Sequence, residues 1–334
     1  MTFESIMESL KKKEWNPIYF LMGDEGYFID KITAYIAANV LTESEKSFNQ
    51  TVVYGKDTST PDVITMSKRY PMMAKNQVII VKEAQNLKKI EDIVYYAEKP
   101  LTSTILVINY KYKTLDKRTK AYKLLSSKYV LFESKKLYDN KVPDWIKGYL
   151  KEKNFTIGPQ ESQLLTDNLG NELSKISNEL DKIIISKKAG DTKITLDDIE
   201  QNIGISKDFN TFELNKAMGQ KNVFKANQIV DYFGKNQKDH PIVLTISSLF
   251  HFFSKVLLYY FVPNKGDRSE TARILGISPF FIDDYSTAAQ KYNKAKVVKI
   301  ISILREFDAR SKGVDNSSSS PAELLKEMIF KILY

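Results

Sequence analysis

The sequence predicts an α/β domain with a parallel sheet, followed by two all-α regions. Three observations support this fold class. The first 137 residues alternate short apolar runs with amphipathic stretches, as a parallel sheet covered by helices on both faces does. From about residue 138, Leu and Ile recur at helical spacing, and from about residue 208 the helical pattern continues to the end. We therefore expect domains at 1–137, 138–207 and 208–334.

Five strands are expected in the first domain. They are rich in Val, Ile and Tyr and mostly apolar on both faces, as strands buried under two helical layers are. The expected ranges are Ile18–Met22, Thr51–Tyr54, Val78–Val81, Ile105–Ile108 and Tyr129–Phe132. Between them, helices are expected to begin near Tyr27, to run from Pro61 to Arg69 with Ser59 or Thr60 as N-cap, and to follow a capping Thr114.

The rest of the chain is expected to be helical. Pro143 fits the first turn of one helix, and Thr195 can cap a short one that opens with Asp197 and Asp198. The last region contains helices at Val223–Phe233, Pro241–Phe261, Ser269–Leu275, Pro279–Tyr285, Ala295–Arg310 and Pro321–Leu333. Its longest apolar stretch contains His251 and Lys255, so we expect a buried helix and no membrane span.

Composition excludes several kinds of chemistry. The chain has 334 residues, 43% of them hydrophobic, no Cys and two His. The lack of Cys removes disulfides, thiolate metal sites and cysteine nucleophiles, and it fits a reducing, cytoplasmic compartment. Two His leave little for a zinc site or a His-based catalytic triad. The N-terminus has no basic segment followed by an apolar run, so no signal peptide is expected.

The turn after the first strand stands where a P-loop ATPase binds phosphate, but it lacks the residues that hold the phosphates. An ATPase of the P-loop type places G-x-x-x-x-G-K-[ST] there, so that glycine amides and a Lys hold the phosphates. Here Gly23 and Gly26 are too close together, and Tyr27 and Phe28 follow in place of Lys and Ser/Thr. The turn also carries acidic side chains, which would repel a polyphosphate. We interpret it as a degenerate P-loop.

A second element of nucleotide chemistry is also missing. In such ATPases a carboxylate pair closes a core strand and helps to hold magnesium. The strand ending at Val81 is followed by Lys82, and the strand ending at Ile108 by Asn109. Two independent losses predict no catalysis by the chain itself, no metal site and no bound cofactor.

Basic residues gather in one part of the chain. The formal net charge is +9, and between Lys82 and Lys153 there are 17 Lys/Arg against 9 Asp/Glu. A surface that faces a polyanion such as DNA explains this concentration, and a solvated helix face is the alternative. The possible DNA-facing residues are Lys111, Lys113, Lys117, Arg118, Lys120 and Lys123.

One short segment suggests a protein-binding site. Pro71, Met72 and Met73 follow an expected helix and precede a core strand. Consecutive side chains of an extended segment point to opposite sides, so at least one Met is expected at the surface. Met is adaptable and common at protein-binding surfaces. The alternative is that both Met side chains fill gaps beneath the sheet.

Several segments together resemble the delta subunit of the bacterial DNA polymerase III clamp loader. The matching segments, in order along the chain, are Tyr19–Glu25, Pro71–Lys82, Leu115–Arg118, Asn178–Lys182, Ile194–Ile199, Phe209–Leu214 and Ala272–Phe280. The resemblance implies a degenerate AAA+/RecA-like domain, a small helical lid-like domain and a C-terminal helical collar that mediates oligomerisation.

The resemblance also implies a function in DNA replication. A delta subunit binds the ring-shaped sliding clamp (beta subunit) and opens it, as an accessory subunit of a polymerase, or nucleotidyltransferase, holoenzyme. Its other partners are the loader's ATPase subunits (tau/gamma), delta-prime and primed DNA. The family's apolar anchor aligns with Met72 and Met73, where many relatives carry Leu-Phe or a similar larger pair. Two alternatives stay open: a stand-alone basic DNA-binding protein, and a nucleotide-dependent enzyme with a non-standard phosphate site.

Overall fold

The computed structural model describes residues 1–315 and 318–334, and they form two compact units. The first comprises Met1–Leu137 and Glu172–Ser174, and the second comprises Tyr138–Asn171 and Lys175–Tyr334. The three-domain division expected from the sequence stays a prediction.

The first unit contains a five-stranded, fully parallel sheet in the order β2-β3-β4-β1-β5. All five expected strands are confirmed, and their bounds are β1 (Ile18–Gly23), β2 (Gln50–Tyr54), β3 (Gln77–Lys82), β4 (Thr104–Lys111) and β5 (Val130–Ser134). The helices of this unit are α1 (Phe3–Lys11), α2 (Gly26–Asn39), α3 (Glu43–Asn49), α4 (Thr60–Ser67), α5 (Val94–Ala97) and α6 (Lys120–Lys128), with 3-10 turns η1 (Ala84–Asn86) and η2 (Ile90–Ile93).

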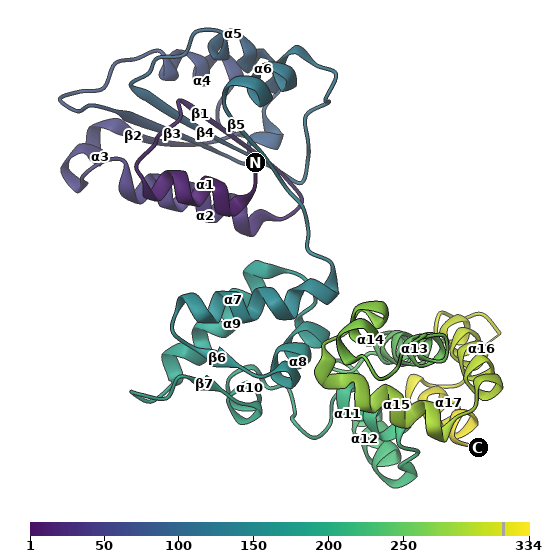
Figure 1. The fold of residues 1–334 in the computed structure, drawn as a ribbon. Helices are drawn as coiled ribbons and strands as arrows, with labels where there is room; N and C mark the ends of the chain where they lie inside the picture. Colours follow the sequence, from purple (N-terminus) through teal and green to yellow (C-terminus); the bar gives the residue numbers. More distant parts are fainter. Residues whose placement is uncertain (316–317) are drawn as a thin grey trace. The chain divides into compact units, whose positions relative to one another are not determined.

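Helices cover both faces of this sheet, as Figure 1 shows. Strand residues alternate between the faces, so Phe20 packs into one core and its neighbour Tyr19 into the other. Helices α4, α5 and α6 contribute to the core of the first face, and α1 and α2 to that of the second. The predicted parallel sheet with helices on both faces is therefore confirmed.

Two expectations for this unit are wrong. The strand β2 is not buried on both faces: it lies at the sheet edge, and Val52 and Tyr54 are exposed. The helix expected after Thr114 begins instead at Lys120, where the Thr119 hydroxyl accepts the hydrogen bond of the Tyr122 amide. Thr114 and Thr119 are both suitable N-cap residues, and the helix begins after Thr119.

The second unit begins with a small helical region. It contains η3 (Asp139–Lys141), α7 (Val142–Glu152), α8 (Pro159–Leu169), α9 (Leu173–Ser186), whose first two residues belong to the first unit, and α10 (Leu196–Ile203). The sequence pattern missed a short parallel pair, β6 (Thr156–Ile157) and β7 (Lys193–Ile194). Each of these strands has only two residues, too few for an alternating pattern to be recognised.

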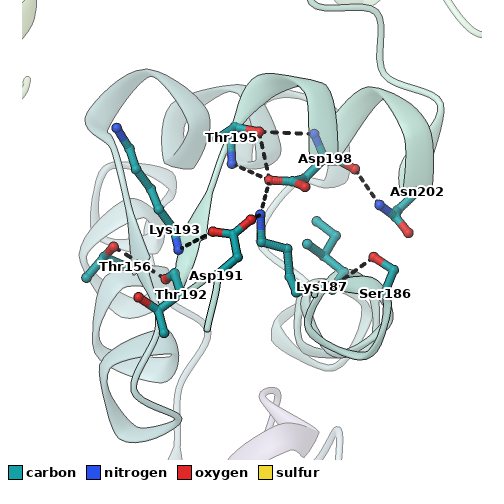
Figure 2. Close-up of polar contacts among 10 residues, drawn as sticks. Thr156, Ser186, Lys187, Asp191, Thr192, Lys193, Thr195, Asp198 and Asn202 are labelled. Carbon is teal, nitrogen blue, oxygen red and sulfur yellow. Dashed lines mark hydrogen bonds and ion pairs between the residues drawn. The ribbon is translucent and has the colours of Figure 1, made fainter. Parts of the chain in front are cut away.

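A buried ion-paired lysine joins the elements of this region. Lys187 follows α9, its side chain is 6% exposed, and its Nζ lies 2.5 Å from Asp191 and 2.9 Å from Asp198 (Figure 2). The same oxygen of Asp198 accepts hydrogen bonds from the Thr195 backbone amide and hydroxyl, which closes a capping box at the start of α10. The expected Thr195 cap is therefore confirmed.

Most of the remaining helices of the second unit share one apolar core, while α14 (Arg268–Leu275) packs in a smaller cluster through Ala272 and Leu275. The bounds of the others are α11 (Thr211–Gly219), α12 (Val223–Lys235), α13 (Ile242–Tyr259), η4 (Pro279–Phe281), α15 (Ile282–Lys291), α16 (Lys294–Ser311) and α17 (Pro321–Leu333). By length and composition alone, α13 could cross a membrane. Its residues Leu249, Phe253 and Val256 are buried in this core, as expected for a core helix, while Leu244 and Phe250 on the same helix are exposed.

Candidate functional site

The turn after β1 packs directly against the backbone of the neighbouring strand β5. Gly23 has a φ of +116°, and a Cβ placed on it would lie 2.2 Å from the carbonyl oxygen of Ser134 on β5. Only glycine allows this close approach. Gly26 is different: it starts α2 without a positive φ, and a Cβ there would meet only the Lys111 side chain at 3.7 Å.

Three amides of this turn already donate hydrogen bonds inside the protein. The Gly23 amide donates to the carbonyl of Lys113 at 3.0 Å, and the Glu25 amide donates to Ser134 at 3.2 Å. The Tyr27 amide donates to Glu25 Oε1 at 2.9 Å. A phosphate cradle needs such amides free to face the ligand. Three amides of this turn are therefore engaged within the protein and do not face a ligand.

Glu25 places a carboxylate where a phosphate would bind. It is the N-cap of α2, it is 5% exposed, and burial raises the pKa of its carboxyl, opposed by the hydrogen bond from the Tyr27 amide. A helix N-terminus favours one negative group. Because Glu25 already supplies that group, a second anion would meet repulsion at this turn.

Asn109, which replaces the expected magnesium-holding carboxylate, has a structural contact. It is buried, and its Oδ1 accepts a hydrogen bond of 2.9 Å from the hydroxyl of Thr33 on α2. The other replacement, Lys82, is exposed at the end of β3. In place of two carboxylates that could hold magnesium, these positions therefore carry a buried amide and a surface cation.

A loop at the amino-terminal ends of the parallel strands contains Pro71, Met72 and Met73, whereas the Gly23 turn lies at their carboxyl-terminal ends. The loop leads into the start of β3, whereas the Gly23 turn follows the end of β1, which runs parallel to β3 through β4. The side chain of Met72 is 63% exposed and that of Met73 103%. Exposure of at least one Met is thus confirmed, and packing of both beneath the sheet is excluded.

The conformation of Met73 differs from the extended one assumed from the sequence. Its φ is +54°, in the left-handed region that costs a residue with a Cβ roughly 1–2 kcal/mol. Such strained residues often occur at binding sites, where the surrounding structure maintains them. The segment that contains Pro71, Met72 and Met73, with Tyr70 before them, is called the anchor loop below.

A buried polar network supports the base of the anchor loop. The side-chain amide of Gln77 donates to the carbonyl of Arg69 and, at 2.7 Å, to the hydroxyl of Thr104. That hydroxyl donates in turn to the carbonyl of Ser67 at 3.0 Å. Because these contacts join the end of α4 to the first residues of β3 and β4, the loop emerges from a rigid base.

The structure adds residues to this site that the sequence analysis did not choose. Phe48 and Tyr70 are 72% and 76% exposed, and Asn49, between Phe48 and β2, hydrogen-bonds the backbone of Met72. One exposed aromatic ring, Tyr70, thus belongs to the anchor loop, and another, Phe48, precedes the residue that contacts the loop. The available sequence signal was the bulky Phe48 in the otherwise polar segment Glu43–Asn49.

Most of the predicted DNA-facing cations have partners. Only Lys120 and Lys123 lie on a helix, α6, and the others are at the end of β4 or in the loop that follows. The carboxylate pairs are Lys111–Asp30 at 2.7 Å, Lys117–Glu133 at 3.9 Å, Arg118–Asp116 at 2.6 Å and Lys120–Glu98 at 2.5 Å. Lys113 donates to the carbonyl of Gln85. These contacts reduce the positive field available to a polyanion.

Comparison with known proteins identifies relatives of the whole chain. The model of the family described as "DNA polymerase III, delta subunit" matches residues 19–135, which include the Gly23 turn, the anchor loop and the basic residues. The DNA polymerase III subunit delta of Bacillus subtilis (strain 168) is 27% identical over 324 residues, covering 93% of this chain and 92% of that protein. The solved Bacillus subtilis DNA clamp loader delta protein covers 99% of both chains, with a TM-score of 0.53 and 22% identity.

Proposed function

Since this chain resembles the delta subunits of bacterial DNA polymerase III along nearly its whole length, we propose that it binds and opens a sliding clamp during DNA replication. It acts within a clamp loader and leaves ATP hydrolysis to other subunits. The observation that carries the proposal is the anchor loop, with Met72 and Met73 exposed on a supported base. An apolar pair of this kind suits a hydrophobic pocket on a protein partner.

The Gly23 turn supports the view that this subunit does not use ATP. Three of its amides have internal partners, and the Glu25 carboxylate stands at the N-terminus of α2. The fold of a nucleotide-binding domain is then kept for its shape, which fits among ATPase neighbours. The loop that we assign to clamp binding lies at the amino-terminal ends of the strands, away from the Gly23 turn.

The helical part of the chain is assigned to assembly. We assign residues 138–207 to a lid-like domain and residues 208–334 to a collar that holds the subunit beside the tau/gamma ATPase subunits and delta-prime. The core shared by α11, α12, α13, α15, α16 and α17 supports the treatment of the collar as one body. Exposed apolar side chains on α13, such as Leu244 and Phe250, suit contacts with neighbouring subunits.

Ring opening gives the direct test of this function. A binder opens a ring only if it prefers the open state, because equal affinity for both states shifts nothing. With a fluorescence donor and acceptor across one clamp interface, we expect this chain to reduce energy transfer to the same extent with and without MgATP. Labelled ATP should show no saturable binding to the chain alone. Unchanged energy transfer at saturating chain, or micromolar ATP binding, would contradict the proposal.

Stand-alone DNA binding is the second candidate, and its salt dependence distinguishes it. A protein that neutralises six phosphates loses affinity steeply with salt, with a slope of about −5 in a plot of log K against log salt. Because Lys111, Lys117, Arg118 and Lys120 are paired with carboxylates, we expect weak binding by the isolated chain and a slope of about −2 or shallower. Fluorescence anisotropy with primed DNA measures it, and tight binding with a steep slope would favour the second candidate.

A further inference from the structure

The side chain of Asn49 holds the backbone of Met72 at two points. Asn49 Oδ1 accepts a hydrogen bond from the Met72 amide at 2.7 Å, and Asn49 Nδ2 donates to the Met72 carbonyl at 2.9 Å. The carboxamide thus pairs with this residue as a neighbouring strand would. Asn49 ends α3 and is 4% exposed, so little water competes for these bonds.

A third hydrogen bond fixes the orientation of the Asn49 side chain. Nδ2 also donates to the carbonyl of Glu45, one turn earlier in α3, at 3.1 Å. Both amide hydrogens and one lone pair of the oxygen are therefore used. A reversed carboxamide would place its oxygen against two carbonyl oxygens and its NH2 group against the Met72 amide. The helix thus presents the carboxamide to the loop in one orientation.

The anchor loop needs such a support because its own side chains do not hold it. Met72 and Met73 are exposed, and Met73 carries the cost of a left-handed backbone. An exposed loop without packing would sample many conformations, and ordering it on binding would reduce affinity. The network of Gln77 fixes the base of the loop, and the contact with Asn49 reaches Met72 itself.

We propose that Asn49 is a positioning residue for clamp binding: it holds the backbone at Met72 so that both Met side chains are presented in their binding geometry. The inference rests on the proposed function, since the loop's partner is the sliding clamp. Asn49 itself lies below the surface and acts through Met72. Helix α3, which also carries the exposed Phe48, is thereby assigned a role in clamp binding.

Three variants test this role in the full-length chain. Asn49→Ala removes all three hydrogen bonds, and we expect clamp binding to weaken at least about tenfold. Asn39→Ala is the matched control, because Asn39 makes the same contact one turn back, to the Tyr35 carbonyl at the end of α2, and is exposed. Its clamp affinity should equal that of the unchanged protein. Asn49→Asp keeps the acceptor and loses the donor while it is ionised.

The pH dependence of Asn49→Asp separates positioning from general damage. Its carboxylate would face the carbonyl oxygens of Met72 and Glu45, which raises its pKa, and the protonated form again accepts from and donates to Met72. Relative to the unchanged protein, the binding deficit is therefore expected to shrink between pH 7.5 and pH 4.5. A deficit independent of pH, or full-strength binding by Asn49→Ala, overturns the proposal.

Hydrogen exchange at the Met72 amide distinguishes failure of this inference from failure of the proposed function. If the unchanged protein does not bind the clamp, the proposed function is wrong. The exchange experiment still decides whether Asn49 holds the loop. Exchange that is slow in the unchanged protein and in Asn39→Ala but fast in Asn49→Ala supports it. Equal exchange in all three proteins overturns it.

Discussion

Replacing Met72 and Met73 together by alanine is expected to weaken binding to the sliding clamp at least about 100-fold. Apolar anchors that fill a partner's pocket carry much of an interface's binding free energy. Met72 is 63% exposed and Met73 103%, so removal of their side chains should change the free energy of unfolding little. Equilibrium binding and the thermal melt of each variant measure the two effects separately, and the melt should be almost unchanged.

Two further variants serve as controls for this result. Tyr95→Ala removes another side chain, 66% exposed, from the same unit and should leave clamp binding unchanged. Met73→Gly removes one anchor while it relieves the left-handed strain, so stability should rise by roughly 1 kcal/mol as binding falls. Clamp binding at full strength by the double Ala variant would show that the anchor lies elsewhere.

The largest effect on stability is expected in the small helical region. Asp198→Ala should destabilise it by about 3 kcal/mol, because Lys187 loses one of its two partners while staying buried and α10 loses its capping box. Asp197→Ala is the matched control on the same helical turn. Asp197 pairs with the partly exposed Lys207 and is itself 64% exposed, so its loss should cost less than about 0.5 kcal/mol.

The acid dependence of this effect follows from the pKa of Asp198. Burial raises this pKa, but hydrogen bonds from Lys187 and Thr195 together with the Lys187 charge outweigh it, so the pKa lies below its usual value. A lowered folded-state pKa stabilises above the unfolded value, and this stabilisation is lost as pH falls through the folded pKa. The difference between the unchanged protein and Asp198→Ala should therefore shrink below about pH 4. Hydrogen exchange across α9 and α10 measures it, and an equal loss in Asp197→Ala would contradict the account.

Much of the fold could be predicted because it depends on strong local signals. Apolar runs such as Ile18–Met22 and Val78–Val81 are too regular to be loops, and the pattern of Pro321–Leu333 gives both ends of α17. The edge position of β2 could not be predicted, because its Val and Tyr residues resemble those of a central strand. Only the sheet order shows that β2 has a neighbour on one side.

The candidate site was predicted in part for a similar reason. The Met72–Met73 pair stands out in the sequence, and so do Gly23 and Gly26. What holds the anchor loop does not stand out: α3 has the polar sequence ESEKSFN, and Asn49 lies 23 positions before Met72. A contact over that distance in the chain leaves no periodic signal. The left-handed backbone of Met73 was also hidden, because Met carries no preference for it.

We propose that this chain binds a sliding clamp through the anchor loop. A photoreactive amino acid at position 73 tests it most directly, with the unchanged chain's clamp affinity measured beside it. The account predicts a stable complex with the clamp of the same organism and crosslinks from position 73 into a hydrophobic pocket of the clamp. The same photoreactive group at position 95, also exposed on this unit, should give none. A complex without crosslinks from position 73, or no complex at all, would contradict the account.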